Sequence, residues 1–64
     1  MASAIVARTR LEGLEYLVHH HGRLDWDPAE DHAERFLSLR EATRTAMRLP
    51  GRFRAFALPV PELH

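Results

Sequence analysis

The sequence contains no cysteine, so neither a disulfide bridge nor a thiolate metal cluster can stabilise the fold. This matters because a domain of 64 residues buries only about 60% of the surface that its unfolded chain exposes. Oligomerisation is the main remaining way to stabilise such a small domain. We therefore expect a single domain, residues 1–64, that forms a homo-oligomer.

Long apolar segments are also absent. No apolar run exceeds four residues, the length of Ala4 to Ala7, whereas a membrane-spanning helix needs about 20. No signal-peptide hydrophobic region precedes a cleavage site. The sequence therefore predicts a cytoplasmic protein with no membrane partner.

Neither sign of charge is in excess, and lysine is absent, so nine arginines balance nine acidic residues. A net charge of zero gives no bulk attraction to nucleic acid or to a membrane surface. The charges are nevertheless segregated along the chain. Residues 25–34 hold five acidic residues and no base, whereas residues 35–54 hold six arginines and only Glu41. Two copies packed antiparallel would place each acidic segment against the arginines of the other copy.

Residues 28–48 are predicted to form an amphipathic helix. Asp27 has the N-cap residue type, Pro28 suits the first helical position, and Glu30 has the spacing of a capping box. Pro50 and Gly51 would end the helix. One broad face of it would carry Ala29, His32, Ala33, Phe36, Leu39, Thr43, Ala46 and Met47.

A first helix is predicted over residues 10–20. Thr9 and Glu12 have capping-box spacing, and Gly22 offers a left-handed C-cap. Apolar residues follow on one stripe, at positions Leu11, Leu14, Leu17 and Val18. Residues 4–8 fit either a continuation of this helix or a short strand.

These elements predict an all-α fold, an antiparallel helical hairpin with an extended, proline-containing tail over residues 50–64. One apolar layer must meet another to leave water, so we expect two copies to form a four-helix bundle. The predicted oligomer interface consists of Leu11, Leu14, Leu17, Val18, Phe36, Leu39 and Met47.

The histidines do not form a recognisable metal or catalytic motif. His19, His20 and His21 are consecutive, so on a helix their side chains point about 100° apart and cannot meet at one ion. His32 would lie on the apolar face of the second helix, where it could titrate near neutral pH or serve as a satisfied core residue. No phosphate-binding loop, zinc-protease motif or nucleophile elbow is present. We expect no enzymatic activity, no metal and no cofactor.

Candidate binding residues lie in the second half of the chain. Arg40, Arg44 and Arg48 recur at helical spacing, and Arg52 and Arg54 could extend the strip, which could contact phosphate or simply face solvent. Phe53 and Phe56 in the tail could dock on a partner protein or cover the chain's own core. The sequence thus predicts a non-catalytic protein–protein interaction or regulatory module.

An alternative arises if residues 4–10 form a strand. The order strand, helix, helix over residues 4–48 then resembles a ribbon-helix-helix repressor or antitoxin, with Val6, Arg8 and Arg10 on the outward face of the strand. This resemblance implies a dimer whose paired strands enter the DNA major groove and whose C-terminal tail binds a toxin. The connection after Gly22 and the length of the second helix depart from that family's pattern.

Overall fold

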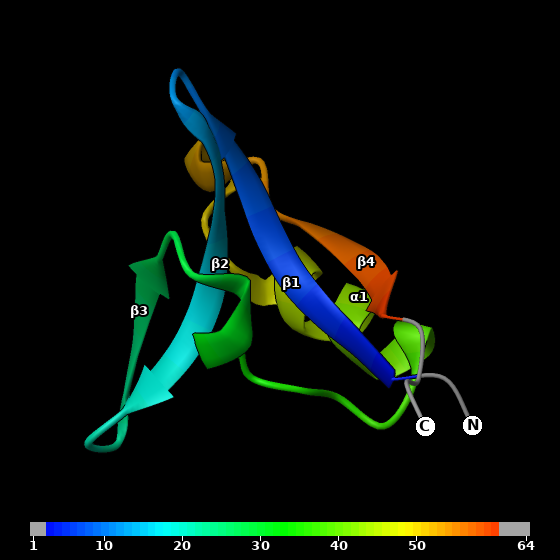
Figure 1. The fold of residues 1–64 in the computed structure, drawn as a ribbon. Coiled ribbons are helices and arrows are strands. Elements are labelled where there is room, and N and C mark those ends of the chain that lie inside the picture. The colour runs from blue at the N-terminus through cyan, green and yellow to red at the C-terminus, as the bar shows by residue number, and fades with distance from the viewer. Residues whose placement is uncertain (1–2, 61–64) are drawn as a thin grey trace.

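Residues 3–60 are described by the computed structural model, which shows a four-stranded antiparallel sheet with one α-helix (Figure 1). Helix α1 (Leu39–Arg48) packs on one face of the sheet, against the two strands that come first and last along the described chain. The strands lie in the order β3-β2-β1-β4. They are β1 (Ser3–Arg10), β2 (Gly13–His20), β3 (Arg23–Asp27) and β4 (Phe56–Val60), with two short 3-10 helices, η1 (Glu30–His32) and η2 (Gly51–Phe53).

The predicted first helix is wrong, because residues 10–20 form the end of β1, a tight turn and β2. Thr9 lies in β1 and Glu12 lies in the turn, so these two residues cap no helix despite their capping-box spacing. Gly13 follows the turn at a φ of 134°, a backbone conformation that other residues rarely adopt. Side chains alternate between the two faces of β2, which pairs with β1. The β2 residues predicted to share one helical face therefore lie on both faces of the sheet.

The predicted second helix is wrong over residues 28–38. Helix α1 begins only after Ser38, whose Oγ accepts a hydrogen bond from the Glu41 N–H at 3.2 Å. Asp27 accepts instead from the Ala29 N–H at 2.7 Å, and only the single turn η1 follows. An all-α helical hairpin, and with it the four-helix bundle, is therefore excluded as the fold of residues 3–60.

The segment between η1 and α1 is extended because it binds to the sheet. Phe36 exchanges two backbone hydrogen bonds with Ala4, at 3.1 and 2.8 Å, and the Glu34 N–H donates to the Leu17 carbonyl at 2.9 Å. The segment thereby lies where β2 diverges from β1 (Figure 1). These long-range bonds satisfy backbone groups that a local helix would otherwise have paired.

The core lies on both faces of β1, where Ala4 to Ala7 are all buried. Because side chains alternate along a strand, Val6 packs with Leu17 and the α1 side, whereas Ile5 packs on the opposite face. Within residues 3–60, nine apolar residues are buried and five of them are alanines, so this part of the chain has a small core. They are Ala4, Ile5, Val6, Ala7, Leu17, Ala33, Ala42, Ala46 and Val60.

Strand β1 is longer than its neighbour β4. The pairing with β4 covers Ser3 to Ala7, and Arg8 to Arg10 pair with β2 alone. The chain reaches β4 through Pro50, η2 and Arg54, beside this end of β1, which β4 does not pair with. The tail expected after Pro50 thus contains a 3-10 turn and then the extended residues of β4. Residues 61–64, also assigned to that tail, lie outside the described residues.

Candidate functional site

A cavity of about 580 Å³ lies between residues 8–10 of β1, η2 and the start of β4. Four of its seven lining residues are arginines and two are phenylalanines. None of the described residues that line it is acidic. The lining consists of Arg8, Thr9, Arg10, Arg52, Phe53, Arg54 and Phe56.

Arg8 lines the cavity and makes several contacts with its neighbours. It lies opposite Glu15 in the β1–β2 pairing, and its Nε and Nη2 donate to Glu15 Oε1 at 2.9 and 2.7 Å. Its guanidinium carbon lies 4.4 Å from the ring centroid of Trp26 and 5.3 Å from that of Phe53. The two rings meet edge to face at 5.8 Å. Arg8 thus joins β2, β3 and η2, with its own charge compensated.

The other three arginines at the cavity are exposed. Within residues 3–60, Arg52 and Arg54 form no ion pair, and Arg10 approaches Glu15 only to 4.0 Å. The guanidinium carbon of Arg52 lies 4.9 Å from the ring centroid of Phe53. Arg8 and Arg10 thus share Glu15, whereas Arg52 and Arg54 present positive charge beside aromatic rings without an ion pair among residues 3–60.

Arg54 has an unusual backbone conformation. Its φ of 52° and ψ of 43° lie in the left-handed region, and its N–H donates to the Gly51 carbonyl at 3.0 Å. A non-glycine residue in this region costs about 1 kcal/mol. The turn geometry alone would favour glycine here, yet the sequence has an arginine whose side chain lines the cavity.

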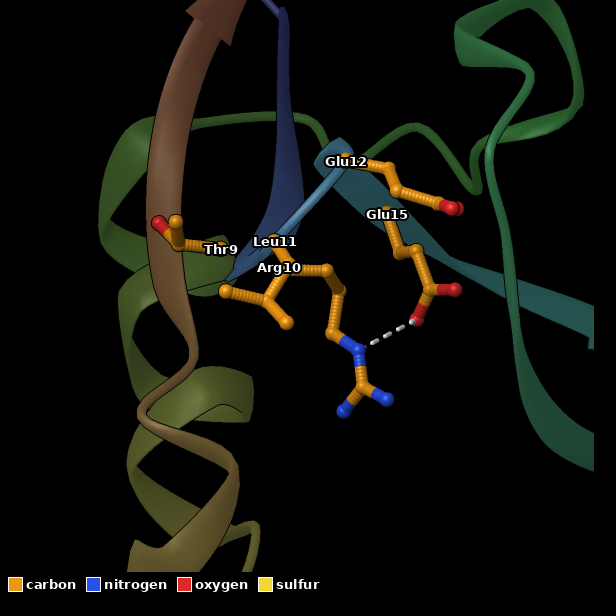
Figure 2. Close-up of a pocket in the computed structure, with 5 residues that line it drawn as sticks. All are labelled: Thr9, Arg10, Leu11, Glu12 and Glu15. Atoms are coloured by element: carbon orange, nitrogen blue, oxygen red, sulfur yellow. Dashed lines mark ion pairs between the residues drawn. The ribbon is translucent and has the colours of Figure 1, made fainter.

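A second cavity of about 580 Å³ lies at the tip of the β1–β2 hairpin (Figure 2). Figure 2 shows Arg10 and Glu15 pointing toward each other, with Nε and Oε1 at 4.0 Å. Glu12 and Glu15 both line this cavity, and Leu11 is fully exposed at its rim. The two carboxylates oppose anion binding here, so the seven-residue cavity is the stronger candidate for an anionic ligand.

The predicted arginine strip is split between two places. Arg40, Arg44 and Arg48 lie on α1 and line a separate hollow of about 430 Å³ together with Glu41. Arg52 does not continue this strip, because α1 ends at Arg48 and η2 carries Arg52 to the seven-residue cavity. Phe53 and Phe56, the predicted tail residues, line the same cavity as Arg52.

The predicted oligomer interface does not form one surface. Leu17 is buried under the α1 side of the sheet, and Val18 and Phe36 are half-buried. Leu11 and Leu14 are exposed at the hairpin of β1 and β2. Two of its members share the outer part of α1, where Leu39 is 47% and Met47 is 80% exposed. These two residues and Thr43 line an apolar hollow of about 470 Å³ beside Arg40 and Arg44.

The histidines lie near carboxylates but in pairs only. His32 Nδ1 is 3.1 Å from Asp27 Oδ2, and His19 Nδ1 is 4.0 Å from Glu34 Oε1. The Ala29 N–H, and then His32, lower the pKa of Asp27 below its usual value. His32 is exposed, contrary to its expected place on a buried helical face. Within residues 3–60, no three histidine or acidic residues lie close enough to hold a metal ion.

Three of the cavity's arginines were not selected for this site from the sequence. Arg8 and Arg10 were singled out only through the ribbon-helix-helix resemblance, and Arg54 only as a possible extension of the helical arginine strip. Two-residue spacing places Arg8 and Arg10 on one face of a strand, but no local signal in the sequence connects them to the arginines after Pro50. No helix within residues 3–60 is long and apolar enough to cross a membrane. No protein family, curated protein or solved structure was found to match the chain.

Proposed function

We propose that this chain is a small non-catalytic protein–protein interaction module that acts as a homo-oligomer. The observation that carries the proposal is the exposure of Leu39 and Met47 on the outer part of α1. Together with Thr43 they form an apolar surface, here called the α1 patch, although the core has few large side chains. Apolar patches of this kind mark contact surfaces more often than isolated exposed residues do.

A second copy of the chain is the occupant that the charges favour. Arg40 and Arg44 border the α1 patch. The acidic residues Asp25, Glu30 and Asp31 are exposed on β3 and η1. In a two-fold symmetric dimer, each acidic surface can meet the arginines of the other copy, and the contact is made twice. Such pairs fix orientation more than affinity, because exposed ion pairs contribute only about 0 to 1 kcal/mol each.

The ribbon-helix-helix alternative loses its structural basis. That arrangement needs a helix directly after the first strand, whereas residues 13–20 form β2 and pair with β1. The two faces of β1 are also covered within the chain, by α1 on one side and by Ala33 on the other. We therefore do not propose a repressor or antitoxin of that type.

Sedimentation velocity over a range of concentrations tests the proposal. We expect the unaltered chain to form a dimer, and the double variant Leu39→Glu/Met47→Glu to remain a folded monomer, because both side chains are exposed. Leu11→Glu is the matched control, since it makes the same change at the hairpin tip and should leave the dimer intact. A chain that is monomeric at every concentration would refute self-association. Loss of the dimer in Leu11→Glu alone would refute the α1 patch.

A further inference from the structure

We propose that the seven-residue cavity between β1, η2 and β4 binds single-stranded nucleic acid. This site lies apart from the α1 patch and does not depend on self-association. All of its lining residues come from one copy of the chain.

Phosphate recognition follows from the arginines at the cavity. Arg10, Arg52 and Arg54 are exposed, and their planar guanidinium groups can donate pairs of hydrogen bonds to phosphate oxygens. Arg8 plays a different part, because Glu15 already compensates its charge. Its guanidinium group lies against the rings of Phe53 and Trp26, and the three exposed arginines lie around this packed group.

The aromatic rings distinguish this site from a simple anion site. Phe53 and Phe56 are half-buried and both line the cavity. Arginine side chains beside aromatic rings are the combination with which proteins bind unpaired bases, because every base has a π face. A volume of about 580 Å³ lies within the range of roughly 300 to 1,000 Å³ typical of ligand pockets.

Unpaired bases are favoured over a duplex by the shape of the site. The rings lie in a hollow between a strand and a 3-10 turn, where they can be reached by a base that is not stacked in a helix. In a duplex the base faces are hidden by stacking, and only the phosphates would be within reach. An acidic peptide could pair with the arginines but would leave the rings without a matching surface.

The zero net charge of the chain does not oppose this assignment. The acidic side chains Asp25, Glu30 and Asp31 lie on β3 and η1, outside the cavity. The left-handed backbone conformation of Arg54 also supports a binding site at the cavity, because strained residues accumulate at binding sites. Glycine would relieve the strain at this position but would remove one cation from the cavity.

Fluorescence anisotropy with labelled single-stranded oligonucleotides of about 12 residues, DNA and RNA, tests the proposal. We expect binding that weakens as salt is raised. The double variant Arg52→Ala/Arg54→Ala should bind at least about tenfold more weakly, and the slope of log affinity against log salt should fall by about 1.4. The matched control Arg23→Ala/Arg35→Ala removes the same charge outside the cavity and should retain most of the affinity.

Two further variants separate stacking and folding from charge. Phe56→Leu keeps an apolar side chain, so it should weaken binding about tenfold without changing the salt slope. Arg54→Gly should weaken binding while raising the melting temperature, an outcome that misfolding cannot produce.

Several results would overturn the proposal. These are absence of binding at low salt, equal affinity for a duplex of the same sequence, and tighter binding of a labelled polyglutamate peptide. Equal loss of affinity in the Arg23→Ala/Arg35→Ala control would also overturn it. The Leu39→Glu/Met47→Glu variant should still bind the oligonucleotide, so failure of self-association and failure of this site give different results.

Discussion

Arg8 and Glu15 lie directly opposite each other on β1 and β2, and two nitrogens of the arginine donate to one oxygen of the glutamate. The Arg8 side chain is only 14% exposed and also packs on Trp26 and Phe53. This pair therefore links the strand pairing to the wall of the candidate site.

Replacing Glu15 should destabilise the protein. Glu15→Gln keeps the shape of the side chain but leaves a largely buried guanidinium without its counter-charge, so we expect a loss of about 1–2 kcal/mol in the free energy of unfolding. Urea denaturation followed by circular dichroism measures it. Glu12→Gln removes an exposed acid from the adjacent turn and should change stability by no more than about 0.5 kcal/mol. Equal effects of the two substitutions would contradict the role of the pair.

Replacing His21 should stabilise the β2–β3 turn. His21 and Gly22 both have positive φ, at 53° and 75°, and two such residues suit asparagine followed by glycine. We expect His21→Asn to gain about 0.5–1 kcal/mol, seen as a higher melting temperature. His20→Asn is the control, because it removes the same contact between the two rings, at 4.2 Å, but puts asparagine in a strand. A lower melting temperature for His21→Asn would contradict this prediction.

The start of α1 can be tested at Ser38. Its Oγ accepts from the Glu41 N–H, so Ser38→Ala should cost about 1 kcal/mol in the free energy of unfolding. Ser38→Asp retains an acceptor at the same position and should keep most of the stability. Thermal melting of both variants checks this. An alanine variant as stable as the aspartate variant would show that the cap contributes nothing.

Asp27 should contribute to the acid sensitivity of the fold. The Ala29 N–H and His32 lower the pKa of Asp27 in the folded chain. The stabilisation is therefore fully present above the usual pKa of an aspartate and is lost as the pH falls through the lower folded value. We expect Asp27→Asn to reduce the loss of melting temperature on acidification through this range. Asp31→Asn, which removes a neighbouring exposed acid, is the control. Identical profiles for Asp27→Asn and the unaltered chain would refute the prediction.

The sequence was informative where a local signal also decides the structure. Pro50 and Gly51 end the helix near the predicted residue, because proline cannot continue it. Residues 39–48 are helical within the predicted span of 28–48. Phe53 and Phe56 were predicted as binding residues from their side-chain chemistry, which does not depend on the fold. Arg52 was predicted as an extension of the helical arginine strip, and α1 ends before it.

The remainder depended on contacts between distant residues. Leu11, Leu14, Leu17 and Val18 fit a helical stripe, yet Leu14 and Val18 also alternate as in a strand, and only the pairing with β1 decides between the two periods. Asp27 does accept a backbone N–H, but the bonds of Phe36 to Ala4 stop any helix after one turn. The cavity was not predictable, because Arg8 and Arg52 meet only once β4 has paired with β1.

That pairing sets an order for folding during synthesis. Strand β1 carries the buried run Ala4 to Ala7, but its second neighbour is the last strand of the described chain. The hairpins of β1, β2 and β3 are local and can form first, leaving one edge of β1 open for addition of another strand. A nascent chain halted before residue 56 would therefore display one edge of the apolar run Ala4 to Ala7, and a chaperone that shields strand edges would have its greatest effect at that moment.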